Sequence, residues 1–492
     1  MNTRPIRFFH RGEVVEVDGL PPTTTVLRYL REHAGCTGTK EGCAEGDCGA
    51  CTVLQGELDA SGQLQLRNVN ACTQFLPTLD GRALLTVEDV GGPERLGPVQ
   101  QALVDCHGSQ CGFCTPGFVM TLTACYEAHL AAGTRPDRQQ LADALAGNLC
   151  RCTGYRPILD AGERMFDAPP ERLDREAITR ALQALASDGP LDYDHAGLRF
   201  HAPRTVPDLA LLCEAYPQAT LLAGSTDVGL WVNKQFRDLP QLIYTGRVDA
   251  LREIRSEPFD GGPGLWIGAA APLEDAWAAL AELAPSLAEL WRRFASPPVR
   301  HAGTMGGNIA NGSPIGDGAP ALIALGADVV LRRGTTQRRL PLQDFYLDYM
   351  KKDLQPGEFI EALHLPRPDT SWAISAHKVS KRHDSDISAV CAVLALQLRN
   401  GQVRQARFAF GGMAAIVKRA AAAEAAVVGQ PWTQAAAEAA AAALPADFTP
   451  LTDMRASQAY RLKVAQNLLR KLWHETLERR TLTIWRAGRL AA

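Results

Sequence analysis

Residues 43–51 read CAEGDCGAC, which places three cysteines within nine residues, separated by small or acidic ones. Little in this stretch is apolar, so packing in a core does not explain the three thiols. Eleven of the 13 cysteines lie between Cys36 and Cys152, and the other two are Cys213 and Cys391. In a reducing compartment, such clustering indicates metal binding rather than disulfides.

The spacing of this first set is C-x4-C-x2-C, which is typical of plant-type [2Fe–2S] sites that a distant fourth cysteine completes. We expect the ligands to be Cys43, Cys48, Cys51 and, in NACTQF, Cys72. The small residues between them let backbone amides point at the sulfurs. Zinc is the alternative, but it favours C-x2-C pairs. Cys36 lies too far upstream and is predicted to be a buried or spare thiol.

The sequence around these cysteines predicts two hairpins and a short helix. Residues 6–20 and 52–69 show strand patterns, the second with a turn at 60–62, and residues 25–34 have a helical pattern. Hairpin, helix, cysteine loop and hairpin follow one another as in a β-grasp ferredoxin. We therefore predict such a domain over residues 1–90.

A second set of thiols consists of two pairs, CGFC at residues 111–114 and CRC at residues 150–152. Between them, residues 116–133 and 138–149 have the apolar spacing of helices, with Pro116 and Gly133 as boundaries. A C-x-C pair cannot face one way from within a helix, so the second pair is predicted to sit on a turn. By spacing alone, zinc and a [2Fe–2S] cluster fit this set equally well.

After Cys152 the composition changes. Residues 166–195 have the character of a linker with one helix at 175–187. A new domain then begins, in which ATLLA (219–223) is predicted to be a short buried strand followed by Gly224–Asp227. Such a turn can present amides to a phosphate, although it is also an ordinary helix start. A second glycine-rich segment covers residues 301–330. No G-x-G-x-x-G follows a strand and no P-loop is present.

Composition excludes several classes of function. The 492 residues carry a net charge of −3 without a long basic run, which argues against nucleic acid or an anionic membrane as partner. No apolar run of signal-peptide length opens the sequence, and no stretch approaches about 18 uninterrupted apolar residues. We expect a cytoplasmic location. The last hundred residues are alanine-rich and predicted to be helical packing segments.

Long motifs resemble those of the molybdenum hydroxylase family, to which the xanthine dehydrogenases belong. GTKEGCAEGDCGACTV resembles the family's first cluster loop, and SQCGFCTPGFVM with GNLCRCTGYRPI resembles its second [2Fe–2S] domain. The resemblance implies that the second site is also a [2Fe–2S] cluster, in a helical-bundle domain over residues 91–165. Cys106 and Cys125 match no ligand position and are expected to pack. The implied ligands of the second cluster are Cys111, Cys114, Cys150 and Cys152.

LLAGSTDVG and GTMGGNIANGSPIGDGAPALIALGA resemble the family's FAD-binding segments. They imply an α+β FAD-binding domain of the vanillyl-alcohol-oxidase (PCMH) type over residues 196–370. An α/β domain like the C-terminal domain of CO dehydrogenase flavoproteins would then cover residues 371–485. The implied diphosphate contacts are Leu221, Leu222, Ala223, Gly224, Ser225, Thr226, Asp227, Val228, Thr304, Met305, Gly306, Gly307 and Asn308. The other implied FAD contacts are Asp317 at the adenosine or ribityl end, Phe294 near the flavin ring, Ile360 and Lys378.

The order of parts from about residue 6 to 480 is similar to the iron–sulfur and FAD subunit of xanthine dehydrogenases, and thus implies a multidomain α+β protein. Two clusters would carry electrons from a molybdenum cofactor in a separate large subunit, where xanthine or hypoxanthine becomes urate. FAD would receive them and reduce NAD+. The resemblance also implies a dimer of heterodimers, and no residue of this chain would act on the purine.

Two other interpretations remain. A related hydroxylase would keep the electron-transfer role but act on an aldehyde, on nicotinate or another N-heterocycle, on an aromatic acyl thioester or on carbon monoxide. A different class would be a free electron carrier or a zinc-bound assembly scaffold, with no catalytic partner. Metal analysis separates this last class from the others, because two binuclear clusters need about four irons per chain.

Overall fold

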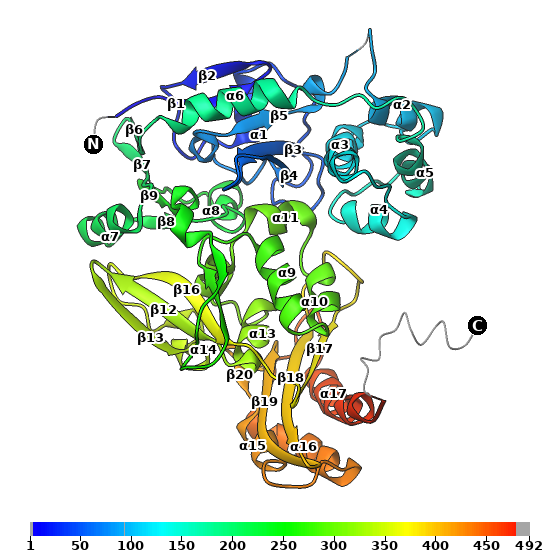
Figure 1. The fold of residues 1–492 in the computed structure, drawn as a ribbon, viewed down its shortest axis with the longest axis vertical. Helices are drawn as coiled ribbons and strands as arrows, with labels where there is room; N and C mark the ends of the chain where they lie inside the picture. Colours follow the sequence, from blue (N-terminus) through cyan, green and yellow to red (C-terminus); the bar gives the residue numbers. More distant parts are fainter. Residues whose placement is uncertain (1–2, 93, 479–492) are drawn as a thin grey trace. The chain divides into compact units, whose positions relative to one another are not determined.

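The computed structural model describes residues 3–92 and 94–478, which form two compact units (Figure 1). The first unit comprises the chain up to residue 212 together with residues 218–249 and 295–303. The second comprises residues 213–217, 250–294 and the chain from 304 onward. The predicted domains and these units divide the chain differently, because part of the predicted FAD domain packs with the N-terminal half.

The predicted ferredoxin-like domain is built around a five-stranded sheet of order β2-β1-β5-β3-β4. Both predicted hairpins are confirmed, and β1 also pairs in parallel with β5. The predicted helix is α1, which starts at Thr25, whose side chain accepts a hydrogen bond from the amide of Arg28. The elements are β1 (Ile6–His10), β2 (Glu13–Val17), α1 (Val26–Glu32), β3 (Thr52–Leu58), β4 (Leu64–Asn70) and β5 (Ala83–Leu85).

Four helices follow and gather in one group (Figure 1): α2 (Pro98–Asp105), α3 (Thr115–Ala132), α4 (Arg138–Ala144) and α5 (Arg156–Arg164). Pro116 lies in the first turn of α3, and Gly133 ends it at φ 65°, in the left-handed region that glycine favours. The first predicted helix of this part is confirmed, whereas the second, predicted over residues 138–149, ends at Ala144. Residues 148–153 are irregular, so the C-x-C pair lies on a turn as predicted.

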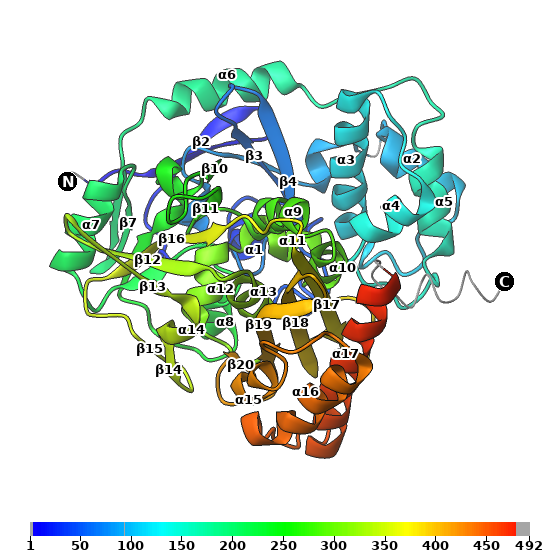
Figure 2. The same cartoon turned by 60° about the horizontal axis from the view of Figure 1, so that its bottom comes forward.

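The segment predicted as a linker is more structured than expected. Its helix α6 (Arg175–Ala186) is confirmed, and it packs through Ile178, Leu182 and Leu185 into the core beside the ferredoxin sheet (Figure 2). The last residues of the predicted linker form a strand of a second sheet. This strand is β6 (Leu191–His195), which pairs with β7 (Leu198–Ala202). Together with β9 (Gln241–Tyr244) and β8 (Thr220–Leu222), these two strands form a four-stranded sheet of order β6-β7-β9-β8. The predicted short strand in ATLLA is confirmed over Thr220–Leu222, but its predicted burial holds only for Leu222.

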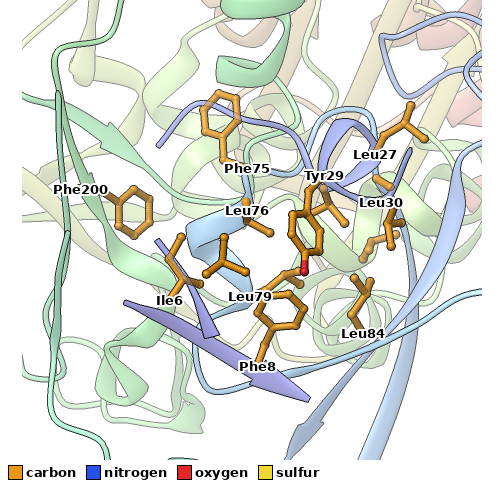
Figure 3. Close-up of a cluster of buried hydrophobic side chains, with 14 of the residues drawn as sticks. Ile6, Phe8, Leu27, Tyr29, Leu30, Phe75, Leu76, Leu79, Leu84 and Phe200 are labelled. Atoms are coloured by element: carbon orange, nitrogen blue, oxygen red, sulfur yellow. The ribbon is translucent and has the colours of Figure 1, made fainter. Parts of the chain in front are cut away.

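One hydrophobic core joins the ferredoxin sheet to the sheet of β6–β9. Ile6 and Phe8 of β1 belong to the same buried cluster as Phe200 of β7 and Leu242 of β9. Figure 3 shows Phe200 with Ile6, Phe8, Tyr29 and several other buried side chains of this cluster. The hydroxyl of Tyr193 donates to the carbonyl of Leu20 at 2.6 Å, which ties β6 to the loop after β2. The two sheets therefore share their apolar burial.

The first unit also contains short connecting helices. They are most of α7 (Val206–Ala215), α8 (Val228–Asn233) and α11 (Pro297–Ala302). Short 3₁₀ helices lie at Leu76–Leu79, Val87–Asp89 and Thr245–Arg247, and another, Asp249–Leu251, crosses the boundary of the units.

The second unit opens with an antiparallel sheet of order β10-β11-β16-β12-β13. Its strands are β10 (Ile254–Ser256), β11 (Gly264–Gly268), β12 (Asp328–Arg333), β13 (Thr336–Pro341) and β16 (Phe359–Pro366). The associated elements are α9 (Leu273–Leu283), α10 (Leu287–Arg293), α12 (Met305–Asn311), α13 (Gly318–Leu325), α14 (Leu342–Phe345), β14 (Tyr346–Asp348) and β15 (Lys351–Lys352).

The C-terminal part of this unit is a four-stranded sheet with helices packed on it (Figure 2). Its elements are β17 (Trp372–Val379), β18 (Val390–Arg399), β19 (Gln402–Gly411), β20 (Lys418–Arg419), α15 (Ala421–Ala425), α16 (Gln434–Asp447) and α17 (Gln458–Glu478). The expectation of a helical last hundred residues was wrong before residue 420, because β18 and β19 pair along their whole length. No helix among residues 3–92 and 94–478 is long and apolar enough to cross a membrane.

The shared core predicts coupled stability in the first unit. Phe200→Ala removes a fully buried ring and should lower the free energy of unfolding by about 3–5 kcal/mol. Hydrogen exchange should then speed up in β1 and β7 together. Leu211→Ala, at a side chain that is 65% exposed, is the control and should change stability by less than about 0.5 kcal/mol. Faster exchange in β7 alone would contradict the shared core.

Candidate iron–sulfur and flavin site

The structure brings the four predicted thiols of the first set together. The Cys43 thiol forms hydrogen bonds with those of Cys48 and Cys72, and Cys72 also forms one with Cys51. The amide of Cys48 donates to the Cys43 sulfur at 3.3 Å. Ala44, Gly46 and Gly49 have φ of 57°, 80° and 69°, so the loop turns through left-handed conformations that suit small residues. Cys36 is buried away from them, with its sulfur 3.7 Å from the Nε2 atom of His10.

The pKa values of the thiols in this set shift in opposite directions, so they do not all ionise equally easily. Hydrogen bonds from Cys48 and Cys72 lower the pKa of Cys43, and those same bonds raise the pKa of both donors, with burial adding to the rise at Cys72. Four thiolates cannot coexist here without positive charge close by, because like charges in a partly buried site repel each other. A bound cationic metal centre would supply that charge.

The second set converges as two pairs of thiols. Cys114 lies beside Cys150, and Cys111 beside Cys152. Burial, followed by the hydrogen bond to Cys150, raises the pKa of Cys114 to about 12. The Thr153 hydroxyl donates to the Cys150 sulfur at 3.2 Å. Cys111 and Cys152 are exposed, in contrast to the buried Cys51 and Cys72 of the first set.

Each thiol set supplies four sulfurs, and two irons with four cysteines take two thiolates each. The donor chemistry therefore fits [2Fe–2S] clusters at both places. Cys106 and Cys125, predicted to pack, lie against the core of the helical part.

Direct hydrogen bonds join the two thiol sets. The amide of Leu149, next to Cys150, donates to the carbonyl of Cys48 at 2.9 Å. The Asn148 side chain donates to the Gly49 carbonyl at 3.1 Å and accepts from the Thr121 hydroxyl at 2.7 Å. A Cβ at Gly49 would lie 2.2 Å from the Gly147 carbonyl oxygen, so only glycine allows this approach. The roles of Asn148 and Thr121 were missed, because their partners are distant in sequence.

The first predicted flavin segment, Leu221–Val228, joins β8 to α8 in the first unit. Ser225 has φ 61°, and a Cβ at Gly224 would lie 2.1 Å from the Ala302 carbonyl oxygen. The segment therefore folds tightly against the end of α11. Because the first turn of a helix leaves amides without intrahelical partners, this turn suits a phosphate group.

The second predicted diphosphate segment, Thr304–Asn308, lies in the second unit, and its backbone amides from Met305 to Asn308 are hydrogen-bonded within the chain. The amides of Met305 and Gly306 donate to the carbonyls of Ala271 and Ala269 at 3.0 and 2.9 Å. The amides of Gly307 and Asn308 donate to the hydroxyl and the carbonyl of Thr304. These four amides are already used within the chain, so a diphosphate contact here would rely on other atoms. Diphosphate binding by this segment stays a prediction.

Asp317 and Lys378 are brought together as a buried ion pair. Their side chains are 5% and 2% exposed, and the Lys378 Nζ atom lies 2.6 Å from the Asp317 Oδ2 atom. The Ser388 hydroxyl donates to Asp317 Oδ1 at 2.6 Å and accepts from Lys378 at 3.0 Å. The Ser388 contact was not predicted. Each charge is satisfied by the other, so flavin contacts by either residue stay a prediction.

The remaining predicted flavin residues are buried. Phe294 follows α10, and its ring lies 5.6 Å from that of Trp277. Ile360 on β16 pairs with Leu331 next to an irregularity in the strand register between Val330 and Leu331. Strand irregularities of this kind redirect side chains near functional sites.

Four family models match successive parts of the chain. They are a 2Fe-2S iron–sulfur cluster binding domain (residues 8–76), a [2Fe-2S] binding domain (86–163), an FAD binding domain in molybdopterin dehydrogenase (195–368) and a CO dehydrogenase flavoprotein C-terminal domain (375–476). The chain belongs to the molybdenum hydroxylase family. It carries that family's iron–sulfur and FAD parts, and the predicted multidomain α+β fold is confirmed.

The similar proteins of this family are named for different substrates. Xanthine dehydrogenase of Drosophila subobscura is 34% identical, over 84% of this chain and 34% of its own length. Aldehyde oxidase 4 of Cavia porcellus is 30% identical, over 86% and 36%. The chain thus spans about a third of the length of the curated relatives it matches. A solved chain of carbon monoxide dehydrogenase from Hydrogenophaga pseudoflava is 29% identical, with TM-score 0.52, and covers 55% of this chain and 94% of itself.

The paired thiols predict a selective loss of iron. Cys48→Ser should remove the first cluster and lower the iron content by about half, because four ligands hold two irons. Cys36→Ser is the matched control and should leave the iron content unchanged. Iron and acid-labile sulfide analysis of the purified proteins checks both outcomes. An equal loss of iron in both variants would show that the ligand assignment is wrong.

The buried ion pair predicts a strong and recoverable loss of stability. Lys378→Met leaves the Asp317 charge buried without its cation and should cost about 3–5 kcal/mol. Adding Asp317→Asn removes that charge and should recover most of the loss. Urea denaturation of the wild type, the single variant and the double variant measures this. A double variant less stable than the single one would exclude mutual neutralisation.

Proposed function

We propose that this chain is the electron-transfer part of a xanthine dehydrogenase. Its two clusters would receive electrons from a molybdenum cofactor in a partner subunit, where xanthine or hypoxanthine is hydroxylated to urate. FAD would pass those electrons to NAD+. When bound, the clusters supply one-electron transfer, and FAD supplies both one-electron and hydride chemistry.

The observation that carries this proposal is the placement of three predicted cofactor segments in one compact unit. Both thiol sets and the segment Leu221–Val228 belong to the first unit. The amide beside Cys150 is bonded to the Cys48 carbonyl, and the Ser225 hydroxyl is bonded to the Thr73 carbonyl beside Cys72. Short hydrogen-bonded connections of this kind favour transfer of electrons from one thiol set to the other and onward to flavin.

The choice of xanthine rests on similarity along most of the chain. The xanthine dehydrogenase of Drosophila subobscura aligns with 84% of this chain. Its identity of 34% is higher than the 30% of the aldehyde oxidase. The alternative is the same role in a hydroxylase of aldehydes or another N-heterocycle, which the aldehyde oxidase match supports. A molybdenum partner is supported by the match to the carbon monoxide dehydrogenase of Hydrogenophaga pseudoflava, which was solved in a form that lacks the Mo-pyranopterin moiety of its molybdenum cofactor. A dimer of such heterodimers remains part of the proposal.

The test is anaerobic reduction of the natively purified chain together with any partner. Xanthine should bleach the flavin and iron–sulfur absorbance, and NAD+ should restore it, with dithionite as the control for full reduction. If dithionite bleaches the bands and xanthine does not, the substrate is wrong or the partner was lost. Molybdenum content and a parallel addition of an aldehyde distinguish these two cases. A preparation with zinc and no labile sulfide would exclude the proposal.

A further inference from the structure

Helix α8 follows the first flavin segment and ends at the first thiol set. Its last residue, Asn233, donates from its Nδ2 atom to the carbonyl of Cys72 at 2.7 Å and to that of Ala44 at 3.1 Å. Cys72 and Ala44 lie in the two separate segments that supply the thiols of the first set. A single amide group therefore holds both ligand segments at once.

The other end of α8 is attached to the same segment. The Ser225 hydroxyl donates to the carbonyl of Thr73 at 2.6 Å, and the Gln74 side chain donates to that of Gly224 at 2.8 Å. A Cβ at Gly229 would lie 2.5 Å from the Thr73 carbonyl oxygen, so the helix packs directly on this backbone. The flavin segment thus rests on the residues that follow Cys72.

The contacts of Asn233 are not easily replaced. Cys72 is buried, with 2% of its surface exposed, and a buried carbonyl without a donor costs more than an average hydrogen bond contributes. The neighbouring Lys234 donates to the Cys43 carbonyl at 2.5 Å, but its side chain is exposed and bonds only one ligand segment. Asn233 is therefore the stronger of the two links to the thiols.

We propose that Asn233 is a positioning residue that couples loading of the first cluster to binding of FAD. The inference rests on the proposed function of both sites. A cluster fixes Cys43 and Cys72 relative to each other, and with them the two carbonyls that Asn233 binds. Helix α8 and the segment Leu221–Val228 are then held in place for the FAD diphosphate. By linkage, each cofactor tightens the binding of the other by the same factor.

The test uses the full chain with its partner, freed of FAD and then titrated with FAD by flavin fluorescence. Wild-type protein with intact clusters should bind FAD about tenfold more tightly than the Cys48→Ser variant, which lacks a ligand of the first cluster. Asn233→Leu should weaken FAD binding about tenfold and abolish its dependence on the cluster. Asn233→Gln keeps the amide donor and should recover part of the coupling. Gln235→Ala, at an exposed side chain just after α8, is the matched control and should change FAD affinity by less than about twofold.

A spectroscopic readout separates positioning from general damage. The electron paramagnetic resonance signal of the reduced first cluster should change when FAD binds to the wild type and stay unchanged in Asn233→Leu. The signal of the second cluster should be the same in both proteins, which checks that the variant is folded. If FAD affinity in Asn233→Leu still depends on the first cluster, the inference is overturned. A wild-type chain without iron or FAD would instead overturn the proposed function.

Discussion

The carbonyl groups of Cys72 and Thr73 are the constraint on which much of the first unit depends. Both residues are buried, and a buried carbonyl needs a donor. The donors come from Asn233 and Ser225, which belong to the flavin side of the chain. Separating that side from the ferredoxin sheet would expose the apolar core around Phe200 and leave these carbonyls unpaired. The chain therefore cannot place the first thiol set without also placing the first flavin segment.

A similar constraint acts on the opposite side of the first thiol set. Gly49 approaches the helical part so closely that its carbonyl oxygen would lie 2.1 Å from a Cβ at Gly117. Asn148 meets the same Gly49 carbonyl, and Leu149 meets that of Cys48. Small residues and amide donors thus connect one cysteine loop to the next by backbone contacts. Backbone contacts fix a separation more rigidly than long side chains do, because fewer rotamers are available.

Local patterns explain which features the sequence predicts well. The cysteine spacings, both hairpins and the boundaries Pro116 and Gly133 depend on residues close in sequence, and the structure shows each of these elements. What local reasoning misses is pairing over long distances. β6 pairs with β7 although its sequence reads as linker, and β18 and β19 form strands in a segment that composition marks as helical. The same holds for Met305 and Gly306, whose amides donate to the carbonyls of Ala271 and Ala269 from another part of the chain.

Asp317 and Lys378 form a buried ion pair where the family resemblance implies flavin contacts. Resemblance marks both residues as flavin contacts, whereas the structure shows each satisfied by the other and by Ser388. A buried pair of this kind adds little net stability, because desolvation of both charges offsets their attraction. An apolar pair of similar volume would serve packing equally well. Stability therefore does not explain why this pair is charged, and contact of either residue with a flavin stays a prediction.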